Sequence, residues 1–238
     1  MHESANPCKL LPVTPLVRAV RDGLAARADP AAAPAMEAYM RSVMPFRGVP
    51  RPARDALVRE LVASLPAPDA PAFAALVREL WDGAEFREDR YVAIALTGLR
   101  RWSPPQDASW VPLYRRWVVE GAWWDTTDEI APKRIGPLLR ADPAVVAPVL
   151  RRWSTDPDRW LRRAAVIVQL GSRGATDTDL LAAVLRANAD DRDPFLRKAV
   201  GWALRQHART DPDWVRRFVA EHPGLSPLSR REALRHLG

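Results

Sequence analysis

Two segments of the chain repeat each other 35 residues apart. The sequence WLRRAAVIVQL at 160–170 is matched by FLRKAVGWALR at 195–205, and more loosely by REDRYVAIAL at 87–96. Apolar residues in these segments recur at helical spacing, and alternating strand patterns are absent. A period of about 35 to 40 residues is typical of paired helices that stack into an α-solenoid of HEAT type, in which one helix of each pair lines a concave face. The repeat therefore predicts an all-α fold.

The same spacing and the Asp-Pro pairs predict where helices lie and begin. Further helical patterns cover 54–65, 71–83, 87–102 and 158–171. Asp can cap a helix whose first residue is Pro, and the Asp-Pro pairs lie at 29–30, 142–143, 156–157, 193–194 and 211–212. Residues 1–33 are predicted to be an Ala/Pro-rich lead-in with one helix around 16–28, and residues 34–238 a single repeat domain.

Composition allows a polyanionic partner but does not prove one. The 238 residues include 36 Lys plus Arg against 29 Asp plus Glu, a net charge of +7. Because nearly all of the cations are Arg in an Ala- and Pro-rich chain, codon bias explains part of this excess, and the positions of the arginines must decide. The single Cys8 excludes an intrachain disulfide and indicates a reducing compartment. No apolar run reaches the roughly 18 residues that span a bilayer, so we expect a cytoplasmic protein without a membrane partner.

Repeat register predicts a row of charged side chains on one face. Arg90, Arg163 and Lys198 occupy equivalent repeat positions, and one period before Arg163 stands Asp128, in the motif WWDTTDEIAP. The register thus predicts one carboxylate in a row of cations. Cations in such a row suit DNA phosphates, which supply affinity without reading sequence.

Six blocks, in order, give the chain a family resemblance. They are YMRSVMPFRGVPRPARDAL, RELWD, WWDTTDEIAP, WLRRAAVIVQL, KAVGWALRQHARTDPDWV and LSPLSRREALRHL. From about Met36 onward the chain resembles the AlkD-like DNA alkylation repair family, HEAT-like DNA glycosylases that excise 7-methylguanine and 3-methyladenine. The resemblance implies double-stranded DNA containing alkylated bases as partner, a monomer, and neither cofactor nor metal.

The resemblance also implies the site residues. The family's catalytic carboxylate falls on Asp128, its aromatic partners on Trp124 and Trp202, its active-site arginine on Arg163, and its DNA-contacting tyrosine on Tyr39. Cleaving an N-glycosidic bond builds positive charge on the sugar, which a carboxylate can stabilise while it positions water. The electron-rich face of a tryptophan suits a cationic base.

Structural alternatives exist for these residues. Asp128 could be an acid in the first turn of a helix whose capping box is Thr126 and Glu129. A tryptophan in an α-solenoid is most often core, and Arg163 could be a solvated surface residue. Pro132 cannot donate to the Asp128 carbonyl, so the backbone there should be irregular.

The C-terminal segment offers a second anion site. Ser229 and Glu232 fit a capping box, which would place Arg230 and Arg231 at the positive end of a helix dipole, where a DNA phosphate would stabilise them.

The leading hypothesis is a monofunctional glycosylase of base excision repair, since no lysine is placed to form a Schiff base. The alternatives are a non-catalytic HEAT-repeat scaffold that binds nucleic acid or protein, and a lesion sensor that binds without turnover.

Overall fold

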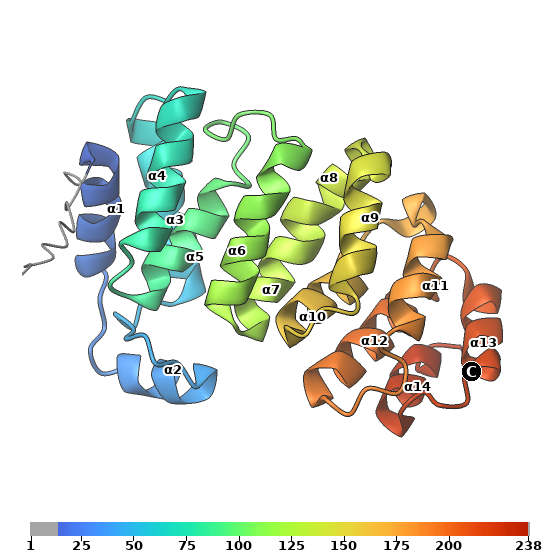
Figure 1. Cartoon of the computed structure of the whole chain (residues 1–238). Helices are drawn as coiled ribbons and strands as arrows, with labels where there is room; N and C mark the ends of the chain where they lie inside the picture. Colours follow the sequence, from blue (N-terminus) through green and yellow to red (C-terminus); the bar gives the residue numbers. More distant parts are fainter. Residues whose placement is uncertain (1–13, 238) are drawn as a thin grey trace, which may run out of the picture. The chain divides into compact units, whose positions relative to one another are not determined.

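All regular structure in the described part of the chain is helical (Figure 1). The computed structural model describes residues 14–237; Cys8 and the first part of the lead-in lie outside them. This confirms the all-α, helical-repeat fold class. The chain forms two compact units that divide between Pro104 and Pro105, and each is described by itself. That residues 34–238 act as one domain stays a prediction.

The first unit contains five helices among its described residues. They are α1 (Pro15–Ala25), α2 (Ala33–Met40), α3 (Arg51–Ser64), α4 (Ala70–Asp82) and α5 (Arg87–Leu96). Helix α1 packs against α3, α4 and α5 and buries Val17, Val20 and Leu24 completely or nearly so. The helix expected in the lead-in is therefore part of the core of this unit.

The second unit stacks its helices in two rows. Its elements are η1 (Ala108–Trp110), α6 (Val111–Gly121), α7 (Trp124–Ile130), η2 (Ala131–Ile135), α8 (Gly136–Ala141), α9 (Pro143–Trp153), α10 (Arg159–Ile167), η3 (Arg173–Ala175), α11 (Thr178–Arg186), α12 (Pro194–His207), α13 (Pro212–Glu221) and α14 (Pro227–Leu234). Helices α7, α10, α12 and α14 pack in succession, and α9 and α11 pack against α10 and against each other (Figure 1). Each helix thus buries its apolar face between neighbours, as a repeat array requires.

The 35-residue period is visible in the hydrogen bonds. Asp158 caps α10 by accepting from the N–H groups of the second and third residues of the helix, and Asp193, one period later, caps α12 in the same way. Arg162 donates to the Asp156 carbonyl at 2.8 Å, and its counterpart Arg197 donates to the Asp191 carbonyl at 2.9 Å. The same loop-to-helix bonds therefore recur in consecutive repeats.

Most helix positions agree with the predictions, with two local differences. The helix expected over 87–102 ends at Leu96, because the chain turns at Thr97 and Gly98. Asp142, Asp193 and Asp211 cap helices that begin with Pro, whereas α10 is capped by Asp158 and not by Asp156. Asp29 accepts from two backbone N–H groups in a turn that precedes α2.

Candidate active site

Helix α7 begins at a sharp corner that places Trp124 in its first turn. Helix α6 ends at Gly121; the next residue, Ala122, has a left-handed backbone with φ 42°, and Trp123 is extended. A Cβ on Gly121 would lie 2.6 Å from Thr126 Cγ2, so only glycine allows α7 to return this closely to α6. Trp124 and Asp128 are four residues apart in α7 and therefore share one face of the helix.

The backbone after Asp128 is irregular, as Pro132 predicts. Residues Ala131–Ile135 form a π-helical turn between α7 and α8, and the Gly136 N–H bonds to the carbonyl five residues earlier, that of Ala131. Pro132 lacks the N–H that a regular helix would donate to Asp128. π-turns inside helices occur frequently at functional sites.

Asp128 and Arg163 form a two-point ion pair between α7 and α10. Arg163 Nε donates to Asp128 Oδ1 and Arg163 Nη2 donates to Oδ2, each at 2.7 Å. The third donor, Nη1, bonds to the Phe195 carbonyl at 2.6 Å, at the start of α12. The guanidinium thus joins three consecutive repeats and fixes the plane of the carboxylate.

The carboxylate keeps access to solvent while its partner is enclosed. The side chain of Asp128 is 18% exposed and that of Arg163 is 7% exposed. Each carboxylate oxygen has two lone pairs, and Arg163 occupies one on each, so a water can still bind at the open side. Burial raises the pKa of Asp128; the hydrogen bonds and charge of Arg163 oppose this rise, while the charge of Asp125 adds to it.

This burial corrects two expectations. Arg163 does not point into solvent as a phosphate contact, because all the bonds above hold its guanidinium inside the unit. Asp128 is not an isolated acid among cations, because it is paired. The alternative in which Thr126 and Glu129 form a capping box with Asp128 in the first turn is also wrong. Helix α7 starts at Trp124 with Trp123 at the N-cap position, and the acid in its first turn is Asp125.

The same three repeats also contribute a cluster of aromatic rings that was not predicted. Trp123 packs against Trp160 and Phe195, with ring centroids 5.7 and 5.4 Å apart, and Trp160 lies 5.0 Å from Phe195. Trp160 is buried, as expected of a core residue. Its position relative to Asp158 recurs one period later as Phe195, a signal that could have predicted this cluster.

Lys198 and Trp202 lie along α12 beyond Phe195. They follow it by three and seven residues, which places all three on one face of the helix, with Trp202 about 10 Å along the axis from Phe195. Lys198 is exposed and Trp202 is half-buried. Their roles toward DNA stay predictions, as does that of the half-buried Trp124.

The C-terminal anion site is not built as expected. Ser226, not Ser229, caps α14, and Ser229 is buried with its hydroxyl bonded to the Arg197 carbonyl. Arg230 directs its guanidinium to carbonyls at the end of α13, at 3.4 Å from Val219 O and 3.3 Å from His222 O. The cation therefore compensates the negative end of α13. Arg231 is exposed, and its DNA contact stays a prediction.

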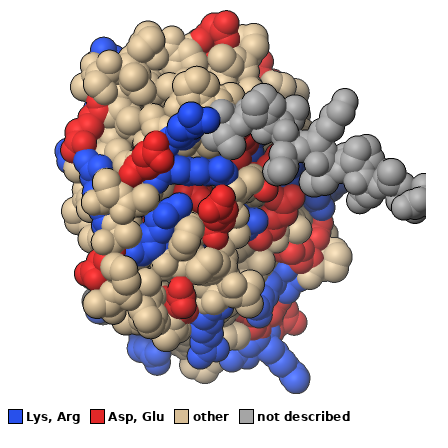
Figure 2. Space-filling view, turned by 90° about the vertical axis from the view of Figure 1, so that its left-hand side faces the viewer, with Lys and Arg blue, Asp and Glu red and all other residues tan. Residues whose placement is uncertain are grey.

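Tyr39 and Arg90 belong to the first unit. Tyr39 is 75% exposed near the end of α2. Arg90 is half-buried with its guanidinium 4.7 Å from the Trp81 ring, a cation–π contact. A row that joins Arg90 to Lys198 stays a prediction. Figure 2 shows basic and acidic side chains interspersed on the face it presents, with several basic ones together at the lower edge.

Comparisons with known proteins now place the chain. It belongs to the DNA alkylation repair enzyme family, whose sequence model matches residues 20–237. A solved structure described as a predicted DNA alkylation repair enzyme from Enterococcus faecalis is similar to it, with a TM-score of 0.75 and 30% identity over 89% of this chain and 97% of that chain. Curated proteins give no match. The family assigns the chain a role in alkylation repair.

The described residues contain neither a membrane-spanning helix nor a cluster of metal ligands. None of their helices is long and apolar enough to cross a membrane. Within 14–237 there is no group of three or more His, Cys, Asp or Glu side chains that could hold a metal ion.

Proposed function

We propose that the protein is a monofunctional DNA glycosylase that hydrolyses the N-glycosidic bond of cationic alkylated purines, such as 7-methylguanine and 3-methyladenine, in duplex DNA. This would be the first step of base excision repair, carried out by a monomer. The observation that carries the proposal is the carboxylate of Asp128, held at both oxygens by Arg163 on a side chain that is still 18% exposed.

The chemistry follows from charge. As the bond to the base breaks, the sugar becomes oxocarbenium-like, and a carboxylate already fixed in position stabilises that charge without reorganisation. The free lone pairs of Asp128 can accept a proton from the attacking water. An alkylated purine already carries a positive charge and leaves as a neutral base, so little acid assistance is needed.

The pairing with Arg163 has a cost and a benefit for this chemistry. It reduces the net charge that the carboxylate presents to the sugar. It also holds the carboxylate in one orientation, and preorganised groups of this kind supply a large share of enzymatic rate enhancement. Trp124, on the same face of α7, is the aromatic group nearest in sequence that could meet the sugar or the cationic base.

The test is release of free methylpurine from methylated duplex DNA, measured by chromatography. The parent protein should release 7-methylguanine, and Asp128→Asn should reduce the rate by at least about a hundredfold, as for the loss of one preorganised electrostatic group. Glu129→Gln is the matched control, because it neutralises the adjacent acid, whose carboxylate is bonded to Lys133. Binding without release by the parent would favour the lesion sensor or the scaffold, and intact release by Asp128→Asn would refute the assignment of Asp128.

A further inference from the structure

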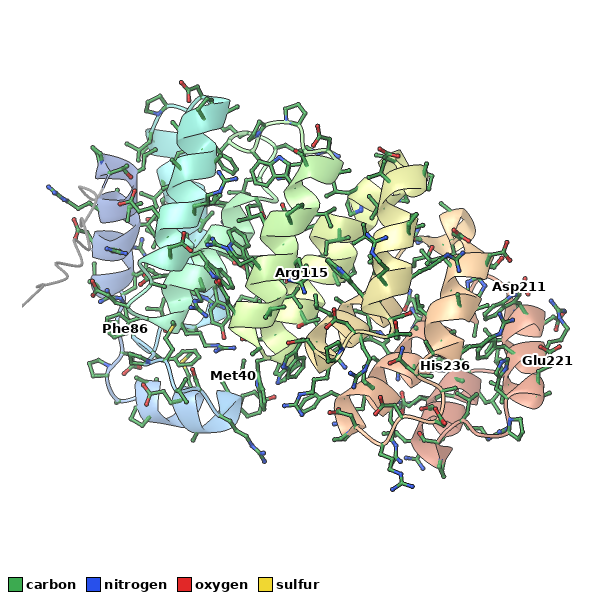
Figure 3. All side chains as sticks on the ribbon, viewed as in Figure 1. Met40, Phe86, Arg115, Asp211, Glu221 and His236 are labelled. Carbon is green, nitrogen blue, oxygen red and sulfur yellow. The ribbon has the colours of Figure 1, made fainter. Side chains whose placement is uncertain are left out.

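Tyr39 at the end of α2 and Val43 in the turn after it form an apolar protrusion. Among the described residues three large apolar side chains are exposed: Val43 at 105%, Tyr39 at 75% and Val145 at 52%. Two of them lie within five residues of each other, beside Met40, which is buried at the end of α2 (Figure 3). Scattered exposed apolar residues need no explanation, but a pair that projects from one short segment suggests a contact surface.

The backbone that carries Val43 is held by local hydrogen bonds. The Ser42 N–H bonds to the Glu37 carbonyl at 3.0 Å, and the Ser42 hydroxyl donates to the Met44 carbonyl at 2.8 Å. Arg41, which precedes Ser42, has a left-handed backbone with φ 48° and caps the C-terminus of α2. Val43 therefore stands out from a defined turn.

The far side of the segment is anchored to the buried start of α5. The Arg87 N–H bonds to the Pro45 carbonyl at 2.9 Å, and the Glu88 carboxylate accepts from the backbone N–H groups of Arg47 and Val49 at 3.0 to 3.1 Å. Glu88 is fully buried. A contact made by such a segment loses little conformational entropy on binding, because the segment is already ordered.

The charges around the protrusion suit a polyanion. From residue 38 to residue 54 the chain contains four arginines and no acid; of these Arg41 and Arg51 are exposed, and Arg51 pairs with Asp55 at 3.5 Å. Arg41 is exposed directly between Tyr39 and Val43. Apolar side chains beside a cation match the surface of a DNA strand, on which the apolar faces of the deoxyriboses alternate with phosphates.

We propose that Val43, with Tyr39, forms a rigid apolar contact to the sugars of duplex DNA, while Arg41 contacts an adjacent phosphate. This inference deepens the proposed function and rests on its DNA partner. The contact would add affinity that does not depend on counterion release, unlike the contacts made by arginine.

The experiment measures the affinity of the full chain for undamaged duplex DNA across a range of salt concentrations. Val43→Ser removes apolar surface and should weaken binding about tenfold at every salt concentration, with an unchanged slope of log K against log salt. Arg41→Gln should instead reduce the magnitude of that slope by about 0.9, as for one lost phosphate contact. Val145→Ser is the matched control, since it makes the same change at an exposed valine of α9, and it should bind like the parent.

Two results would overturn the proposal. The first is that the Val43→Ser variant binds DNA as tightly as the Val145→Ser variant. The second is that the Val43→Ser variant keeps its DNA affinity but no longer self-associates in sedimentation, which would make the protrusion a contact between copies of the chain. A parent that binds DNA and loses affinity in Val43→Ser, yet releases no methylpurine, refutes the glycosylase and leaves the contact standing. Melting temperatures should not differ between the two serine variants and the parent, because both valines are exposed.

Discussion

Breaking the pair of Asp128 and Arg163 one partner at a time tests whether the site depends on it. Asp128→Asn keeps the shape of the side chain but leaves the 7% exposed guanidinium of Arg163 without its counter-charge. Removing one partner of a buried ion pair costs about 3 to 5 kcal/mol, and we expect about 3 kcal/mol, because the carboxylate is 18% exposed and the bond to Phe195 survives.

Arg163→Met removes the other partner and should destabilise by a similar amount. In the double variant neither charge is left alone, so the loss of unfolding free energy should be smaller than the sum of the two single losses by about 1 to 3 kcal/mol. Denaturant unfolding of the parent, both single variants and the double variant measures this coupling. Strictly additive losses would refute an energetic role for the pair.

The pair should also set the acid limb of catalysis. The proposed mechanism requires the ionised carboxylate, so we expect excision to fall as the pH falls through the pKa of Asp128. Hydrogen bonding and charge from Arg163 lower that pKa, so Arg163→Met should raise it further and move the acid limb to higher pH. The pH–rate profiles are measured over the pH range in which every variant is folded. An acid limb of Arg163→Met that coincides with the limb of the parent would contradict this role of Arg163. Because Arg163 is enclosed, the slope of log K against log salt should not change.

Three further predictions concern stability. Asp193→Ala should cost about 1 kcal/mol in denaturant unfolding, because it removes the cap of α12, and Asp190→Ala, which caps no helix, is the control. Gly201→Ala should cost about 1 to 3 kcal/mol, since its Cβ would lie 2.7 Å from Glu232 Cβ in α14, whereas Gly174→Ala meets nothing within 4 Å and should not. Burial lowers the pKa of His207 below 6.5, and the charge of Asp211 partly opposes this shift. The unfolded chain therefore takes up the proton at a higher pH than the folded chain does. The free energy of unfolding that neutral His207 contributes is present above the pKa of the unfolded chain and is lost as the pH falls toward the pKa of the folded chain. The melting temperature of the parent should therefore decline as the pH falls through this range, and His207→Phe should make the decline smaller. An unchanged decline would exclude His207 as its source.

Elements fixed by local chemistry could be predicted from the sequence. Asp142, Asp193 and Asp211 precede Pro and cap helices, because a short acid and a residue with a preset φ both favour a first turn. The capping boxes at Thr126 and Ser229 were wrong although both fit the motif. In each case an earlier residue starts the helix. Ser226 caps α14 and is followed by Pro227, so this start has the same local signal as the Asp-Pro helices. Helix α7 begins after Trp123, which provides no side-chain cap, and its close return to α6 at Gly121 and Thr126 leaves no local signature.

The position of Arg163 shows how much of the candidate site the repeat register can predict. Register places Asp128 and Arg163 at equivalent positions, and equivalent residues of neighbouring repeats lie beside each other on packed helices, here α7 and α10. Opposite charges at such positions should therefore pair with each other before either meets a ligand. The sequence contained this pairing in its 35-residue separation, whereas the burial of the Arg163 guanidinium depends on the packing of three consecutive repeats, which the separation alone does not specify. Lys198, one period further along, has no acid at the preceding position and stays exposed, and we expect it to be the member of the predicted row that contacts a phosphate.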